Sequence, residues 1–227
     1  MRVLEILSDS NRGGAGVYLE NYAANASPDT EIVAALPQGA MMAGRLRRAG
    51  AQVVECALHA DTSFNRHDVA VLRTCIETFS PDVVHTHGSL SGRIAARLAG
   101  RCKTVYTKHT LSPPRRGIKG RAAAALDNRV TDAVIAVSRA AQDNLLQDGL
   151  DPSKVFLIYN GITGFSPAGP EQKKRAREAL GIPQGGIVAA CVARLEPVKN
   201  HRMLLEAFAQ AACGDGPPLT LLLCGDS

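Results

Sequence analysis

The chain has 227 residues, 45% of them hydrophobic and 21% charged, proportions that are ordinary for a folded globular protein and exclude disorder as its main state. Its formal net charge is +5 and its pI is near 9.0, which favours an anionic partner: nucleic acid, acidic lipid or a phosphorylated small molecule. Tryptophan is absent and aromatic residues make up only 4%, which argues against the base-stacking surfaces of single-stranded nucleic-acid binders. We expect no nucleic-acid partner.

The cysteines and the lack of long apolar runs bear on the cellular compartment. None of the six cysteines forms a CxxC pair, and most lie inside apolar strand or helix patterns, as reduced thiols of a cytosolic protein do. No apolar run approaches the roughly 18 residues that a membrane span needs. The apolar start is short and is interrupted by Glu5, so it does not resemble a secretory signal. We expect a cytoplasmic protein.

Short apolar strands alternate with helical patterns through the first two thirds of the chain. Strands are expected at residues 3–7, 31–36, 52–56, 82–85, 104–107, 133–137 and 155–159. Helices are expected at 17–26, 44–49, 68–78, 90–98, 120–129 and 139–148. Continuously apolar strands such as Val134-Ile135-Ala136-Val137 indicate burial on both faces. The alternation therefore predicts an α/β fold, a Rossmann-like parallel sheet domain over residues 1–162.

A second unit is expected after a linker rich in Gly, Pro, Ser and Thr at residues 160–170. A helix is predicted at 171–180, followed by a strand at 187–192, a helix at 201–212 and a strand at 219–224, after which the sequence ends at Gly225-Asp226-Ser227. A lone βαβ unit leaves a sheet edge and a sheet face uncovered. We therefore interpret residues 163–227 as a linker and the incomplete start of a second Rossmann-like domain.

Glycines cluster between the first strand and the first helix, as Gly13-Gly14-Ala15-Gly16. Glycine there lets backbone amides approach an anion at a helix N-terminus, although the same cluster also suits a plain flexible turn. A dinucleotide fingerprint is disfavoured, because Leu19 stands where its third glycine belongs and the second strand ends without an acidic residue.

Three histidines follow predicted strands. His85 and His87 lie at the end of the fourth strand and would share one face, so a metal site is conceivable; without a third nearby ligand, hydrogen-bonding histidines are the favoured interpretation. His109 follows the fifth strand in Thr107-Lys108-His109-Thr110. At the carboxyl end of a strand it could bond a substrate hydroxyl or carry a proton, or it could be purely structural.

Two basic segments remain. The loop with Arg115, Arg116 and Lys119 is either a solvated surface segment or a surface for an anionic acceptor or a membrane. Arg194 and Lys199 lie between the strand at 187–192 and the helix that follows it. A guanidinium and an ammonium near a helix start suit a diphosphate.

Together these motifs resemble the retaining GT-B glycosyltransferases of family 4 (glycosyl transferases group 1). The resemblance runs over the whole chain, and its most specific parts are the Arg194…Lys199-Asn200 segment and the Asn160-Gly161-Ile162 turn. It implies a GT-B fold, in which a nucleoside-diphosphate sugar lies in the cleft between two Rossmann-like domains and a hexose passes to a glycan or lipid-linked acceptor in envelope polysaccharide or lipopolysaccharide synthesis.

The resemblance also implies roles for individual residues. Arg194 and Lys199 would hold the diphosphate and stabilise the leaving group, and His109 would contact the transferred sugar near the anomeric carbon. Donor contacts are also expected at Gly14, Gly16 and Asn160, whereas His87, Arg115, Arg116 and Lys119 are candidates for acceptor or membrane contact. Transfer would retain the anomeric configuration by front-face attack, and no metal or other cofactor is expected.

One feature of the family is not reached. Its glutamate motif follows well after the Arg…Lys pair, and the chain stops first, so we expect this polypeptide alone to be inactive or nearly so. The alternative hypothesis is a truncated, non-catalytic module that binds acceptor, membrane or a partner chain. As an enzyme, the protein is expected in the cytoplasm, with peripheral contact to the inner face of an anionic membrane.

Overall fold

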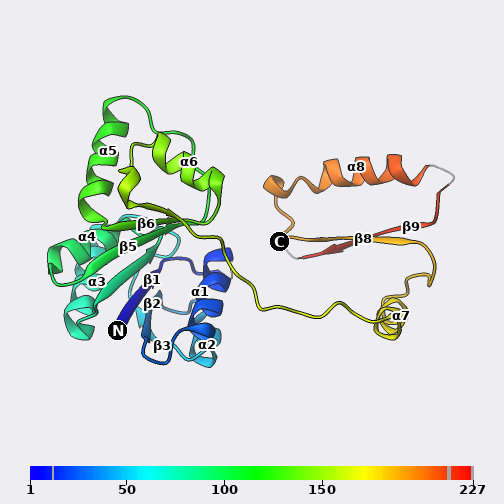
Figure 1. The fold of residues 1–227 in the computed structure, drawn as a ribbon, viewed down its shortest axis with the longest axis horizontal. Helices are drawn as coiled ribbons and strands as arrows, with labels where there is room; N and C mark the ends of the chain where they lie inside the picture. Colours follow the sequence, from blue (N-terminus) through cyan, green and yellow to red (C-terminus); the bar gives the residue numbers. More distant parts are fainter. Residues whose placement is uncertain (12, 214–215, 226–227) are drawn as a thin grey trace. The chain divides into compact units, whose positions relative to one another are not determined.

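The computed structural model describes residues 1–11, 13–213 and 216–225. The chain divides into two compact units, Met1–Thr163 and Gly164–Ser227, and each is described by itself (Figure 1). Asp226 and Ser227, where the sequence ends, lie outside the described residues. Within the described residues, no helix combines the length and apolarity needed to cross a membrane.

The first unit is built on a seven-stranded sheet with the order β3-β2-β1-β4-β5-β6-β7. Every neighbouring pair of these strands is parallel. The strands are β1 (Arg2–Leu7), β2 (Glu31–Pro37), β3 (Gln52–Cys56), β4 (Val83–His87), β5 (Lys103–Lys108), β6 (Ala133–Ala136) and β7 (Val155–Leu157). The helices are α1 (Gly14–Asn25), α2 (Ala43–Arg48), α3 (Arg66–Phe79), α4 (Leu90–Ala99), α5 (Gly117–Val130) and α6 (Arg139–Gln147), and the short 3-10 helix η1 (Pro152–Lys154) precedes β7.

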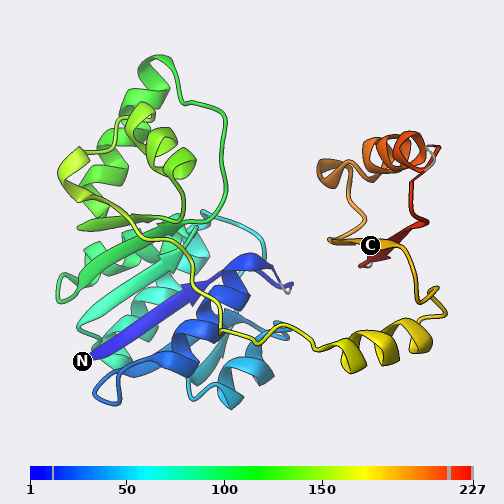
Figure 2. The same ribbon diagram turned by 45° about the vertical axis from the view of Figure 1, so that its right-hand side comes forward.

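Helices cover both faces of this sheet (Figure 2). On one face, Leu7 and Leu36 pack against α1 and α2 through Leu19 and Leu46. On the other face, strand residues pack against α3 and α4 in a second cluster of Leu4, Ile6, Val33, Ala35, Leu72, Cys75, Ile76, Val84, Ala95 and Ala96. Burial on both sides explains continuous apolar runs such as Ile32 to Leu36 of β2.

The strand order reverses direction between β1 and β4. From β1 the chain moves outward through β2 and β3, then returns to place β4 on the other side of β1. In open parallel sheets, ligands bind at the carboxyl ends of the strands at such a switch point. The register pairs Glu5 with His85 and Leu7 with His87, so these residues come together at that place.

The predicted elements are all present, most of them with shifted ends. β4 extends to His87, so this histidine belongs to the strand and not to the loop after it. β7 stops at Leu157, and α5 begins at Gly117, three residues before the predicted start. Gly117 has a φ of 68°, which glycine adopts without strain and which lets the chain turn sharply into the helix.

The second unit contains α7 (Pro170–Ala179), β8 (Ile187–Val192), the 3-10 helix η2 (Pro197–Lys199), α8 (His201–Ala212) and β9 (Leu219–Cys224). β8 and β9 pair in parallel from Ile187 with Leu219 to Val192 with Cys224, and both strands have the predicted bounds. Among its described residues, only Ile182 is a buried hydrophobic side chain. This unit therefore presents much of its apolar surface to solvent, including Val192, Val198 and Met203.

Candidate functional site

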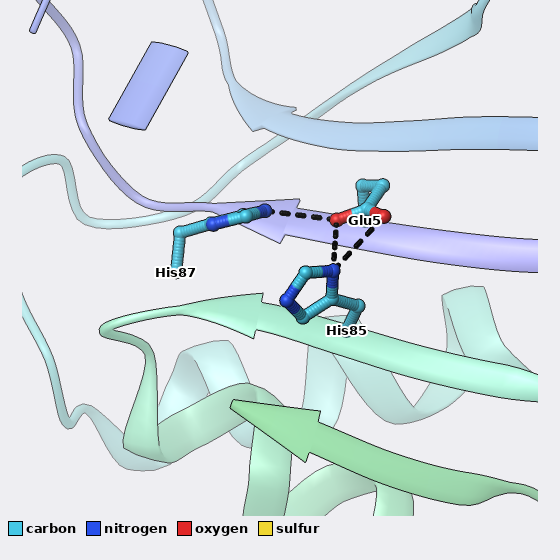
Figure 3. Close-up of side chains that lie close together, drawn as sticks. All are labelled: Glu5, His85 and His87. Atoms are coloured by element: carbon cyan, nitrogen blue, oxygen red, sulfur yellow. Dashed lines mark hydrogen bonds and ion pairs between the residues drawn. The ribbon is translucent and has the colours of Figure 1, made fainter. Parts of the chain in front are cut away.

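A buried carboxylate lies at the centre of the switch point. Glu5 is fully buried within β1, where a charged side chain needs hydrogen-bonding partners. Nδ1 of His85 lies 3.1 Å from one of its carboxylate oxygens and 3.0 Å from the other, and Nε2 of His87 lies 2.8 Å from the second oxygen (Figure 3). Both histidines come from β4 and are buried too. Two imidazoles thus converge on one carboxylate.

The contacts extend to β5. Nδ1 of His87 and Nε2 of His109 are 2.9 Å apart, and Nε2 of His85 is 2.7 Å from the hydroxyl of Thr107. Glu5 of β1, His87 of β4 and His109, which directly follows β5, therefore form a continuous hydrogen-bonded chain, which we call the histidine chain. Only its last member, His109, is partly exposed.

Tyr18 of α1 covers the histidine chain. Its ring centroid lies 5.4 Å from the rings of both His87 and His109, and 6.5 Å from that of His85. Burial, followed by the nearby negative charge of Glu5, raises the pKa of Tyr18 to about 12, so its hydroxyl stays protonated.

Burial and charge set the protonation states. Burial by itself would raise the pKa of Glu5, but attraction to His85 and the hydrogen bonds from both histidines lower it to about 2. Burial lowers the pKa of His87 despite the opposing effect of Glu5. Burial, and then repulsion from His87 and His85, lowers the pKa of His109 to about 4. At neutral pH, Glu5 is a carboxylate, and His87 and His109 are neutral.

The expectation that no third group lies near His85 and His87 is wrong. Glu5 supplies it, and one ligand-capable atom from each of the three residues lies within 4.8 Å of the others. Such a set could hold a metal ion, but the carboxylate hydrogen bonds already account for the observed geometry. The signal in the sequence is the charged Glu5 inside an otherwise apolar strand.

The structure also changes the expected place of His87. Its side chain is fully buried and both ring nitrogens have partners, so it lies beneath His109 and not on a surface where an acceptor or membrane would touch it. The structure therefore places His87 where an acceptor cannot contact it directly.

The glycine cluster forms the start of α1. Gly13 is the N-cap residue with extended backbone, and Gly14 opens the first turn. A Cβ at Gly14 would meet nothing within 4 Å, whereas Gly16 is buried against Met42. Gly14 thus leaves the amide end of the helix open to an anion, while the missing side chain of Gly16 serves packing within the first unit.

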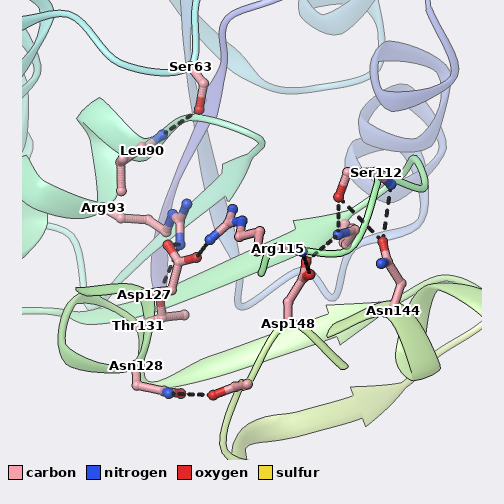
Figure 4. Close-up of polar contacts among 12 residues, drawn as sticks. Ser63, Leu90, Arg93, Ser112, Arg115, Asp127, Asn128, Thr131, Asn144 and Asp148 are labelled. Carbon is pink, nitrogen blue, oxygen red and sulfur yellow. Dashed lines mark hydrogen bonds and ion pairs between the residues drawn. The ribbon is translucent and has the colours of Figure 1, made fainter. Parts of the chain in front are cut away.

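The basic loop after β5 is anchored on one side (Figure 4). Asp127 of α5 accepts from the Arg93 guanidinium at 2.8 Å and from that of Arg115 at 2.6 Å. The backbone N–H of Arg115 also donates to Asp148 at 2.9 Å. Arg115, one of the predicted acceptor or membrane residues, is therefore held by two carboxylates. Its neighbours Arg116 and Lys119 are exposed.

In the second unit, Arg194 and Lys199 are exposed on the segment between β8 and α8. Arg194 forms an ion pair with Glu196, and the N–H of Lys199 donates to the carbonyl of Glu196 at 2.9 Å. Asn200 then caps α8 by accepting from the N–H of Met203. Both cations lie in the short segment just before α8. The N-terminus of that helix carries a partial positive charge, so this segment suits a phosphate group. The remaining predicted donor residue, Asn160, is exposed after β7 in the first unit.

The sequence matches a protein family and a set of curated relatives. The profile of Glycosyltransferase Family 4 matches residues 12–163. The chain is 28% identical over 167 residues to a D-inositol 3-phosphate glycosyltransferase of Corynebacterium glutamicum, an alignment that covers 66% of this chain and 40% of the relative.

Solved structures show the same fold. HepE from Anabaena, in complex with UDP and glucose, has a TM-score of 0.78 and 24% identity, covering 100% of this chain and 61% of that one. The apo lipopolysaccharide outer core galactosyltransferase WaaB has a TM-score of 0.62 and 18% identity, with 100% of this chain and 61% of that one covered.

The doubly covered parallel sheet is shared with these solved glycosyltransferases, which have the GT-B fold. The chain belongs to Glycosyltransferase Family 4. It spans 40% of the length of the Corynebacterium relative and 61% of the HepE chain.

Proposed function

We propose that this protein binds a nucleoside-diphosphate sugar and serves in the transfer of its hexose, with retention of configuration, to an acceptor. The observation that carries the proposal is the pairing of family membership with a neighbour, HepE, whose structure contains UDP and glucose. Family membership gives the protein class, and we add to it a donor, a stereochemical course and an acceptor.

Each unit offers groups for a different part of the donor. Arg194 and Lys199 are the cations for the diphosphate, on which negative charge grows as the sugar departs. In the first unit, the open amides at Gly14 and the partly exposed ring of His109 are the groups for phosphate and sugar. We also assign Gly16 a backbone contact and Asn160 a polar contact to the donor. Two cations and a helix N-terminus supply leaving-group stabilisation, so we propose transfer without a metal.

For the acceptor, we propose a glycan or a lipid-linked glycan of the cell envelope, made in the cytoplasm with peripheral contact to an anionic membrane. Arg116 and Lys119, the exposed cations of the basic loop, would meet the anionic part of that acceptor or membrane. A phosphorylated polyol is the second candidate, favoured by similarity to D-inositol 3-phosphate glycosyltransferases.

Calorimetric titration of the purified protein with UDP, GDP and their sugar conjugates tests the donor proposal. The variant Arg194→Ala/Lys199→Ala should lose binding. Arg202→Ala is the matched control, because Arg202 is an exposed cation of the adjoining helix whose partner is Glu206, and it should bind as the wild type does. Equal affinity in the double variant and the wild type would refute the diphosphate role. No binding of any nucleotide to the wild type would refute donor binding by this polypeptide.

A further inference from the structure

We propose that Glu5 and His87 are positioning residues that fix the tautomer of His109, with its proton on Nε2 and an unshared electron pair on Nδ1 for a hydroxyl of the ligand. What the ligand is rests on the proposed function, but the tautomer itself does not. The direction of each hydrogen bond along the histidine chain determines the direction of the next.

The first step is the carboxylate. An ionised carboxylate only accepts hydrogen bonds. The pKa of Glu5 is far below neutrality, so at pH 7 both of its oxygens are acceptors. Nε2 of His87, 2.8 Å from one of them, must therefore carry a hydrogen and donate it. The same holds for Nδ1 of His85 on the other side of the carboxylate.

The second step is His87. A neutral imidazole has one N–H and one bare nitrogen. With its hydrogen committed to Glu5, His87 has a bare Nδ1, which can only accept. The partner 2.9 Å away is Nε2 of His109, so that nitrogen must be the donor. Burial, which lowers the pKa of His87, keeps the ring neutral and prevents it from donating on both sides.

The third step is His109. Once its single hydrogen is on Nε2, Nδ1 is bare. Nδ1 has no hydrogen-bond partner among residues 1–11, 13–213 and 216–225. It is also absent from the buried atoms that lack a partner, so it is accessible to an incoming group. A bare nitrogen accepts from a hydroxyl and gives no hydrogen bond to a carboxylate or a phosphate oxygen. His109 is thereby assigned to a hydroxyl-bearing part of the ligand, not to its anionic part.

The groups around the histidine chain do not change its order of hydrogen-bond donors and acceptors. His85 bonds to Thr107 through its other nitrogen, and a hydroxyl can either donate or accept, so that branch imposes nothing on His87. Tyr18 touches the histidine rings with its aromatic face and edge. The hydrogen order therefore has a single source, which is the charge of Glu5.

Long-range proton–nitrogen NMR spectra of isotope-labelled protein at pH 7, without ligand, test this directly. Such spectra distinguish a protonated ring nitrogen from a bare one. We expect His109 as a single form, protonated at Nε2. Nα-acetylhistidine in the same buffer is the reference for an imidazole with mixed tautomers. Protonation of His109 at Nδ1, or a mixture of tautomers like that of the reference, would overturn the proposal.

Two variants test the source of the order. Glu5→Gln replaces the acceptor-only carboxylate by an amide that can also donate, and His87→Phe removes the acceptor but keeps a flat ring beneath Tyr18. In both, His109 should become a mixture of tautomers; an unchanged Nε2 form in both would overturn the role of Glu5 and His87. If a variant fails to fold, the wild-type spectrum still decides.

The same sample separates this inference from two others. Metal analysis should find no stoichiometric ion; one bound equivalent that a chelator removes, with a change at His87, would overturn the hydrogen-bonded chain in favour of a metal site. Nucleotide-sugar binding is measured separately. Its absence would refute the proposed function, while the ligand-free spectrum would still confirm or refute the tautomer.

Discussion

Gly16 in α1 lies directly against Met42, so that a Cβ at position 16 would be 2.7 Å from Cγ of that methionine. Met42 is fully buried and has little room to move. We expect Gly16→Ala to lower the free energy of unfolding, because overpacking a core costs about 1–3 kcal/mol. The higher helix propensity of alanine offsets a smaller part of that cost. Urea denaturation measures the change.

Gly14→Ala is the matched control for this substitution, because a Cβ at Gly14 would meet nothing within 4 Å. We expect its unfolding free energy to be unchanged or slightly higher, so that any loss of nucleotide affinity reports on the ligand. Equal stability of the two variants would show that the contact with Met42 is not restrictive.

Asp127 is the counter-ion of two arginines. The Arg93 side chain is only 5% exposed, and Asp127→Ala would leave it buried without its partner. Breaking a buried pair in this way costs about 3–5 kcal/mol. As a control, Glu77→Ala removes the exposed pair with Arg73, for which about 0–1 kcal/mol is expected. Urea midpoints of the two variants should differ clearly, and similar midpoints would contradict the structural role of Asp127.

Mild acid should destabilise the first unit through its buried histidines. The pKa of His109 in the folded protein is about 4, below the value of about 6.5 for an unfolded histidine, and that of His87 is lowered too. The unfolded chain therefore binds more protons below pH 6.5, and stability falls as the pH falls from there towards 4. Glu5, with a pKa of about 2, adds a further loss only below about pH 4.5.

Denaturant midpoints at several pH values check this slope. His109→Asn should make the decline between pH 6.5 and 4.5 shallower, since one neutral buried imidazole is removed. Gln147→Asn, an exposed substitution that changes no titratable group, should leave it as steep as in the wild type. A flat profile in the wild type would contradict the neutral state of the buried histidines.

Gly225 packs against the turn that carries Arg194. A Cβ at Gly225 would overlap the carbonyl oxygen of Ala193, a backbone atom that cannot move aside alone. We expect Gly225→Ala to displace this turn and weaken UDP binding about as much as Arg194→Ala does, with the unfolding of the first unit unchanged. Wild-type affinity in calorimetry would show that the turn tolerates the displacement.

Binding to acidic liposomes checks the basic loop. Arg116→Ala/Lys119→Ala should reduce sedimentation with anionic vesicles at low salt, because each exposed cation contributes about 1 kcal/mol near such a surface. Arg73→Ala, on α3, removes an exposed cation outside the loop and serves as the control. No sedimentation of the wild type, even at low salt, would refute membrane contact.

The fold was predictable because its signals are local. Strands such as Val134 to Ala136 are apolar throughout, and their alternation with helices defines a parallel sheet without knowledge of any contact. The bounds of β8, α8 and β9 were predicted to the residue. The strand ends of the first unit were predicted less accurately. His87 lies inside β4, because pairing with Leu7 of β1 extends that strand.

The site was only partly predictable. The position of His109 at a strand end followed from the pattern, but its link to Glu5 depends on the parallel register of two strands about 80 residues apart. A single sequence does not contain that register. The anchoring of Arg115 by Asp127 and Asp148 was invisible for the same reason, since all three lie on different segments.

The path from Glu5 through His87 to His109 runs across the strands and not along any one of them. The outermost histidine thus depends on an atom contributed 104 residues earlier in the chain. In hybrids assembled from this protein and its relatives, a crossover anywhere between β1 and β4 would join a foreign first strand to the native histidines. Such a hybrid can fold and still present a differently protonated ring to the ligand, so the segment from β1 through His109 should be exchanged as one block.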